Sequence, residues 1–169
     1  MEKSKTEIET IILEFLKEHG ESYFTCALAT CHDNVPRNTP IDARNDGLNM
    51  YFVADQGGKL ENIRENPDVC LAVFIPVGKG YMTNARGLQM WGKAHIIKKE
   101  IDPGAFQKGF NTIRLDEISM SLNGKPFPDK AKEELTIIKI VPQKISYFVS
   151  MGEKPKKYIW QGQKMKCEK

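Results

Sequence analysis

The stretch DQGGKLENIRENPDV, Asp55 to Val69, lies between the apolar runs LNMYFVA and VCLAVFIP. Gly57 and Gly58 allow backbone angles and close approaches that a side chain would block. Lys59 follows where a short helix is expected to begin, next to backbone N–H groups that have no partner within the helix. Such a helix start suits an anion, most often a phosphate, although a plain glycine turn with a solvated lysine has the same pattern. The stretch therefore raises the question of whether a phosphate binds at Lys59.

The composition is that of a folded domain. Of the 169 residues, 40% are hydrophobic and 28% are charged, which is not typical of disorder. No apolar run approaches the length of a membrane span, and the charged N-terminus lacks the apolar core of a signal peptide. Cys26, Cys31, Cys70 and Cys167 are scattered without a C-x-x-C pair, which indicates neither a zinc site nor a disulfide framework. We expect a cytoplasmic protein with no membrane contact and no metal.

The net charge of +3 is distributed unevenly. Residues 152–169 hold six lysines and two glutamates, so that the rest of the chain carries a charge of −1. A nucleic-acid-binding domain would normally show a basic face on the fold itself. We therefore expect no nucleic-acid partner, and a single domain, 1–169, with an N-terminal helix in 1–20 and a basic C-terminal tail in 152–169.

Hydrophobic periodicity predicts few helices. The first, 6–20, is expected to begin at a capping box formed by Thr6 and Glu9 and to end at Gly20. A short helix belongs to the opening stretch, and one longer helix is expected over 103–122.

The remaining chain alternates with period two and predicts strands. Pro36 and Pro40 favour an edge or bulged strand, and Asn45 to Gly47 is a strong hairpin signal. Gly87 and Gly92 are expected bend points in a long strand. The predicted strands are 23–30, 35–45, 48–54, 68–76, 81–99 and 135–150.

Many strands joined by hairpins predict an antiparallel barrel or sandwich that is mainly β. The segment DVCLAVFIP, 68–76, is apolar on both sides and should be a central strand. The short helix of the opening stretch joins two sequential strands where a tight turn would suffice, which is unusual.

These segments also carry a family resemblance. RNTPID, MYFVA, GGKLENIRENPDVCLAVF and GKA occur in the order and spacing of the pyridoxamine 5′-phosphate oxidase-like family, over roughly Tyr23 to Ile97. The resemblance implies a split β-barrel with flanking helices that binds flavin mononucleotide (FMN) at a homodimer interface. It also answers the opening question by analogy, because Lys59 is similar to the family lysine that meets the flavin phosphate.

Further positions follow from the same resemblance. Arg37 matches the arginine that joins the lysine at the phosphate, which needs cations and backbone donors. Gln89 and Trp91 match the strand that reaches the flavin from the second subunit. Alternatively, Arg37 is a surface residue, Gln89 is solvated, and Trp91 is a core or interface aromatic. The implied cofactor-binding residues are Arg37, Asn38, Thr39, Pro40, Ile41, Asp42, Phe52, Val53, Gly58, Lys59, Gln89 and Trp91.

The sequence departs from the family pattern in two places. Gly57 and Gly58 replace a polar pair before the lysine, which leaves backbone N–H groups and Lys59 for the phosphate. The Arg-x-His substrate motif of true pyridoxamine-phosphate oxidases is missing near the C-terminus, because the histidines are His19, His32 and His95. The resemblance therefore supports a flavin site better than it supports a vitamin B6 substrate.

Three functions remain open from the sequence. The first is an FMN-dependent oxidoreductase acting on a small molecule, in which the flavin performs the redox chemistry. The second is a flavin- or haem-binding module without turnover. The third is a nucleic-acid-binding barrel that uses the tail lysines with Tyr158 and Trp160 for stacking.

Two predictions concern surfaces. The apolar face of the barrel, with Leu88, Met90 and Trp91 of the long strand, is expected to form a symmetric dimer interface. The segment PKKYIW should fold back on the barrel and bury Trp160, while QGQKMKCEK stays mobile.

Overall fold

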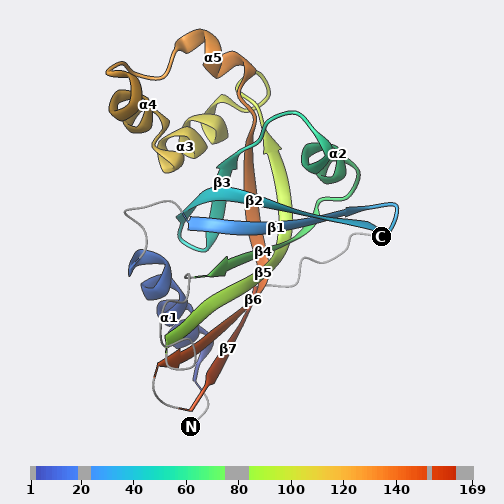
Figure 1. Cartoon of the computed structure of the whole chain (residues 1–169), viewed down its shortest axis with the longest axis vertical. Helices are drawn as coiled ribbons and strands as arrows, with labels where there is room; N and C mark the ends of the chain where they lie inside the picture. Colours follow the sequence, from blue (N-terminus) through green and yellow to red (C-terminus); the bar gives the residue numbers. More distant parts are fainter. Residues whose placement is uncertain (1–2, 19–23, 75–83, 152–153, 163–169) are drawn as a thin grey trace.

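The computed structural model describes residues 3–18, 24–74, 84–151 and 154–162. Its strands form a barrel, with helices at both ends (Figure 1). The elements, in chain order, are α1 (Lys5–Glu18), β1 (Phe24–His32), β2 (Val35–Asp46), β3 (Asn49–Val53), α2 (Gly58–Glu65), β4 (Asp68–Phe74), β5 (Asn84–Ile97), α3 (Pro103–Ile113), α4 (Leu115–Asn123), α5 (Asp129–Glu134), β6 (Ile137–Met151) and β7 (Lys156–Gln161).

The described strands form one antiparallel sheet in the order β3-β2-β1-β4-β5-β6-β7. β3 also pairs with β6, which closes β1 to β6 into a barrel and leaves β7 as an extension beyond β6. The helices α3, α4 and α5 lie together at one end, between β5 and β6 in the chain, whereas α1 lies near the opposite end (Figure 1). This arrangement confirms the predicted antiparallel split β-barrel with flanking helices.

Two tight turns set the register of the first three strands. Asp33 and Asn34 adopt positive φ values of 50° and 60° between β1 and β2, and Gly47, with φ 58°, turns β2 into β3. β2 pairs with β1 along 35–43 and with β3 only along 44–46. The predicted edge strand is therefore confirmed for 35–43, the part that contains both prolines. Proline has no backbone N–H to donate, and the edge of this part that faces away from β1 needs no such donor.

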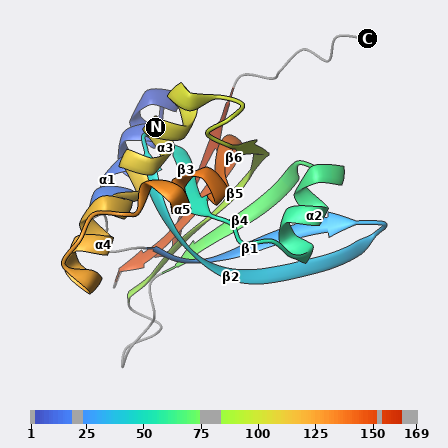
Figure 2. The ribbon, with the colours of Figure 1, turned by 90° about the horizontal axis from the view of Figure 1, so that it is seen from above.

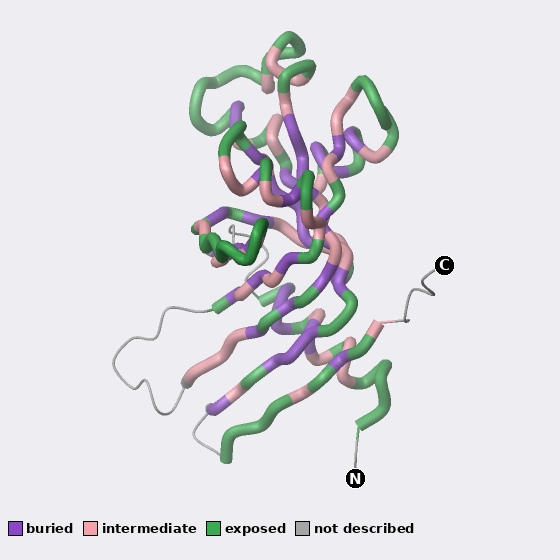
Figure 3. The backbone as a smooth tube through the Cα atoms, turned by 90° about the vertical axis from the view of Figure 1, so that its right-hand side faces the viewer, coloured by how far each residue is buried: buried purple, intermediate pink, exposed green. Residues whose placement is uncertain are grey.

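The strand β4 is central, as predicted, because it pairs with β1 and β5. Only one of its faces is buried within the chain: Val69, Leu71 and Val73 face the core, whereas Phe74 is exposed. The second apolar side of this central strand is therefore not covered within one chain. Figure 3 shows this pattern along the strands as alternating purple and green.

One of the two predicted bend points lies at a β-bulge. The register of β5 against β6 shifts between Trp91 and Gly92. A Cβ on Gly92 would stand 2.3 Å from the carbonyl oxygen of Val141, so the close approach of the two strands requires glycine. At Gly87 the pairing with β6 runs on without a shift.

The capping box of α1 is formed by other residues than predicted. Ser4 and Glu7 make it: the Ser4 backbone N–H and hydroxyl donate to the Glu7 carboxylate, and the Glu7 N–H donates to the Ser4 hydroxyl. Thr6, in contrast, lies within the helix, and its backbone carbonyl oxygen accepts from the Thr10 hydroxyl. Gly20, the predicted C-terminal cap, lies outside the described residues.

The predicted long helix over 103–122 is two helices. Asp102 caps α3 by accepting from the Ala105 N–H, and Pro103 occupies its first turn. Arg114 then adopts the left-handed conformation, with φ 62° and ψ 41°, and α4 starts in a new direction. A third short helix, α5, was not predicted. Among the described helices, none is long and apolar enough to span a membrane.

The core is divided into two clusters. The larger fills the barrel and includes the inward residues of β1, β3, β4 and β6 together with α1 and α2. The smaller lies on the other side of β3, where Tyr51 packs with Phe106, Phe110 and Ile113 of α3. Seen from above in Figure 2, α2 and the α3–α5 group lie on different sides of the strands. The end of β3 thus lies between the two groups of helices, where the candidate site is found.

Candidate functional site

The opening stretch forms the predicted strand–helix–strand unit. Gly57 precedes α2 with φ 143°, a conformation that favours glycine, and it provides no side-chain cap. Its carbonyl oxygen accepts from the N–H groups of Leu60 and Glu61 at 2.9 and 3.1 Å. The buried side chains of Leu60 and Ile63 then anchor the helix to the core. The start of α2 is therefore held in place while its outer side remains open to a ligand.

Arg37 of β2 lies against the start of α2. A Cβ built on Gly58 would stand 2.6 Å from a terminal guanidinium nitrogen of Arg37 and 2.7 Å from its central carbon. The guanidinium thus occupies the space that a side chain at position 58 would need. This contact brings an exposed arginine next to the half-buried Lys59, although 22 residues separate them in the chain.

The residues of RNTPID divide between the two faces of β2. Arg37, Thr39 and the buried Ile41 lie on one side of the strand. Asn38, Pro40 and Asp42 lie on the other side and are exposed. The hydroxyl oxygen of Thr39 is buried and has no hydrogen-bond partner among the described residues. An unpaired buried hydroxyl is costly unless a ligand supplies its partner.

A groove of about 420 Å³ joins β2, β3, α2 and the α3–α4 junction. It contains two ionisable side chains, Asp42 and Lys59, and its other walls are apolar. The structure thus brings together five predicted residues with three residues from the helices. The lining consists of Pro40, Ile41, Asp42, Val53, Lys59, Ile113, Leu115 and Ile118.

The helical wall was missed by the sequence analysis. Ile113 and Leu115 are two residues apart and would point in nearly opposite directions in one continuous helix. The left-handed Arg114 between them allows both side chains to line the groove, together with Ile118. A ligand group that meets this wall contacts branched aliphatic side chains, which favour apolar surface.

Three predicted residues lie away from this groove. The side chain of Phe52 is fully buried in the barrel core. Gln89 and Trp91 are exposed on β5, opposite Ala72 and Cys70 of β4. Register across β1 and β4 places Gln89 three strands from Pro40, roughly 14 Å at the usual strand spacing. Within one chain, Gln89 and Trp91 therefore do not join the residues around Lys59.

The two histidines within the described residues, His32 and His95, are not among the residues that line the groove. His95 lies on β5, opposite Lys139 of β6, and burial together with the charges of Lys139 and Lys93 lowers its pKa. His32 lies at the end of β1 with its imidazole 3.3 Å from the Asp33 carboxylate. In the described residues, no three His, Cys, Asp or Glu side chains cluster in a way that could hold a metal ion.

The fold is an antiparallel split barrel, and the sequence match names the family. The family model for pyridoxamine 5′-phosphate oxidase matches residues 12–147. The chain therefore belongs to the pyridoxamine 5′-phosphate oxidase family. A search of curated proteins found no match.

Solved structures share the fold at low sequence identity. A Clostridium acetobutylicum protein related to general stress protein 26, of the pyridoxinephosphate oxidase family, is 13% identical, with a TM-score of 0.60 over 94% of this chain and 96% of its own. An FAD-binding protein from Mesorhizobium loti is 19% identical, with a TM-score of 0.59 over 80% and 91%. A heme binding protein from Mycobacterium smegmatis is 12% identical, with a TM-score of 0.62 over 96% of this chain and 60% of its own.

Proposed function

We propose that the chain is an FMN-binding flavoprotein and an oxidoreductase that acts on a small molecule. The observation that carries the proposal is the contact between the Arg37 guanidinium and Gly58, beside Lys59 at the start of α2. Two cations and the first N–H groups of a helix form a site for a phosphate that carries nearly two negative charges. The unpaired Thr39 hydroxyl on the same strand is a further group that fits a polar ligand.

The remaining groove residues fit the rest of FMN. Along β2 from Pro40 to Asp42, one edge has no ladder partner among the described residues, because this part of the strand pairs there with β1 alone. When bound, FMN supplies the electron transfer, whereas the protein positions it and excludes water. The apolar side chains of Ile113, Leu115 and Ile118 supply the water-excluding wall.

We also propose that two chains form a homodimer with the flavin at their interface. Gln89 and Trp91 are not among the residues that line the groove at Lys59, but they lie on an exposed sheet face. A second chain can bring its own Gln89 and Trp91 to the groove. Leu88 and Met90, predicted for the same interface, are 2% and 0% exposed and pack in the core instead.

The test of the phosphate site uses Lys59→Ala and Arg37→Ala. Hydrogen bonds to charged groups contribute about 1.5–3 kcal/mol, so each variant should bind FMN roughly one to two decades more weakly. Riboflavin, which lacks the phosphate, should bind the parent weakly and respond little to either substitution. Isothermal titration with both ligands measures the difference.

Lys130→Ala serves as the control, because Lys130 is exposed on α5 and lies outside the residues that line the groove. The phosphate site would be refuted by Lys59→Ala and Arg37→Ala proteins that hold FMN as tightly as the parent. Anaerobic NAD(P)H oxidation by the FMN-loaded protein then separates an oxidoreductase from a flavin carrier without turnover.

A further inference from the structure

A second cleft, of about 830 Å³, lies between the N-terminal end of α1 and the strand β7. It lies at the end of the molecule opposite α2 and the α3–α5 helices (Figure 1) and shares no lining residue with the groove at Lys59. Its lining consists of Lys3, Lys5, Ile8, Lys156, Lys157, Tyr158, Ile159 and Gln161.

The cleft is strongly basic. Of the eight described residues that line it, four are lysines and none is acidic. The nearest acidic side chains of α1 in sequence have partners of their own: Glu7 accepts from Ser4, and Glu9 accepts from the indole N–H of Trp160 at 2.9 Å. The eight lining residues thus carry positive charge and no carboxylate, with the Lys5 Nζ lying 5.1 Å from the centre of the Trp160 ring, and such a lining favours an anionic ligand.

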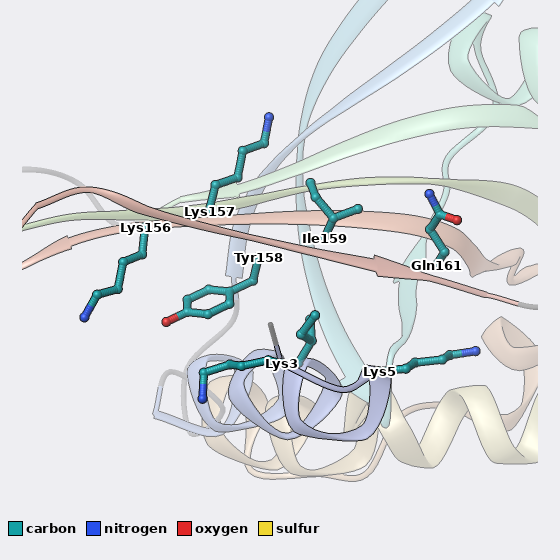
Figure 4. A pocket seen from close by; sticks show the side chains of 8 residues that line it. Lys3, Lys5, Lys156, Lys157, Tyr158, Ile159 and Gln161 are labelled. Atoms are coloured by element: carbon teal, nitrogen blue, oxygen red, sulfur yellow. The ribbon is translucent and has the colours of Figure 1, made fainter. Parts of the chain in front are cut away.

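The backbone of β7 is available at this cleft. Among the described residues, β7 is the last strand of the sheet and pairs with β6 alone, through residues 144–149. Its side chains alternate: Lys156 and Tyr158 point toward α1, whereas Lys157 and Ile159 point to the other face (Figure 4). Lysine and apolar groups therefore lie on both faces of one open strand edge. Ile159 is 37% exposed there.

We propose that this cleft, which we name the β7 cleft, binds an extended acidic peptide segment that adds as a strand to the free edge of β7. Backbone groups of an edge strand supply affinity in this mode of recognition, and alternate side chains supply specificity. Alternate acidic side chains of the peptide would meet Lys3 and Lys5 on the side of α1, and the apolar ones between them would meet Ile159 on the other face. A second copy of β7 is disfavoured, because its own Lys156 and Lys157 would bring like charges together.

The aromatic residues favour a peptide over a nucleic acid. Single-stranded nucleic acids bind through aromatic rings that stack on the bases. The Trp160 ring is only 8% exposed, and Tyr158 is half-buried with its ring 6.1 Å from that of Tyr147. The structure therefore contradicts the stacking role that the sequence suggested for Trp160.

The experiment measures fluorescence anisotropy of a labelled six-residue peptide of alternating glutamate and valine, added to the full chain. Two double variants carry the same change of charge: Lys3→Glu with Lys5→Glu on the α1 side of the β7 cleft, and Lys125→Glu with Lys130→Glu at the other end of the molecule. The first should weaken binding roughly tenfold, since each exposed pair contributes up to about one kcal/mol. The second should leave binding at the level of the parent.

Two further probes separate an added strand from a simple charge effect. The same peptide with N-methyl groups on alternate residues keeps its charge but loses backbone donors, and it should bind at least tenfold more weakly. An oligothymidylate should bind more weakly than the unmodified peptide. The proposal is overturned if the methylated peptide binds equally well, if the oligothymidylate binds better, or if the two double variants behave alike. FMN plays no part in these measurements, so they do not depend on the proposed flavin site.

Discussion

Gly58 shows how one missing side chain can shape a binding site. The family resemblance places a polar pair before the lysine, and this chain has Gly57 and Gly58 there. The structure gives a reason: the Arg37 guanidinium fills the space of a side chain at position 58. The sequence could predict that Arg37 and Lys59 act together, but it could not predict that Gly58 is what lets them meet.

We expect Gly58→Ala to weaken FMN binding by displacing Arg37. The new methyl group would stand 2.6 Å from a guanidinium nitrogen, so the end of this flexible side chain must move. In an Arg37→Ala background the same substitution should cost little, and a double-mutant cycle of FMN affinities should show strong coupling. Gly104→Ala is the control, because its Cβ meets only an ordinary contact of 3.6 Å. If the losses of FMN affinity caused by Arg37→Ala and Gly58→Ala simply add in the double variant, the contact between Arg37 and position 58 does not affect binding.

A buried thiol makes stability depend on alkaline pH. Burial, with a smaller contribution from the Asp42 charge, raises the pKa of Cys26 from 9.0 to about 12. The folded state keeps a proton that the unfolded chain loses above about pH 9, so the free energy of unfolding should fall between pH 9 and 12, by at most about 1.4 kcal/mol per pH unit. Urea unfolding at several pH values should show a shallower decline for Cys26→Ala than for the parent. Cys31→Ala is the matched control, and equal slopes for both variants would argue against this role of Cys26.

At the scale of elements, the sequence predicted the turns, helix starts and bends that are determined by a few adjacent residues. The hairpin at Gly47, the start of α2 and the bulge at Gly92 follow from glycines whose neighbours admit few alternatives. The break at Arg114 has no such signal, because arginine is a good helix former and rarely adopts positive φ. Tertiary packing decides there, since both Ile113 and Leu115 face the groove. One wall of the candidate site was therefore invisible in the sequence.

The tail prediction is confirmed for its first part: residues 156–161 form β7, and Trp160 is buried with its indole N–H donating to Glu9. The predicted mobile part, 163–169, lies outside the described residues. We expect Trp160→Ala to lower the free energy of unfolding by about 3–5 kcal/mol, the usual cost of removing a large buried aromatic.

Truncation after Gly162 should change stability little, whereas truncation after Lys154 removes β7 and should lower the thermal midpoint. Equal midpoints for both truncations would show that β7 does not stabilise the barrel.

At the scale of the whole molecule, one face of the sheet carries apolar side chains that a single chain does not bury. β4 has apolar residues on both sides, yet only its inner side is buried, and the exposed face of the sheet continues onto β5 and β6. The large apolar side chains on this outer face are Phe74, Trp91 and Phe148, with exposures of 49%, 36% and 41%. The proposed homodimer would cover this outer face, which a single chain leaves exposed. The same reasoning explains why Gln89 and Trp91 lie away from Lys59.

If this outer face joins two chains, a charge at its centre should separate them and empty the flavin site. We expect the parent to behave in light scattering as twice the 19.2 kDa chain, and Trp91→Glu to behave as one, because a buried charge without a partner is costly. FMN affinity should fall together with the dimer, since each site would lose the partner's contribution. Leu122→Glu is the matched control: Leu122 is 76% exposed on α4, away from the sheet face, and its variant should remain a dimer that binds FMN. A parent protein that is monomeric with FMN bound would refute the interface, and a monomeric Trp91→Glu variant with full affinity would place the whole flavin site within one chain.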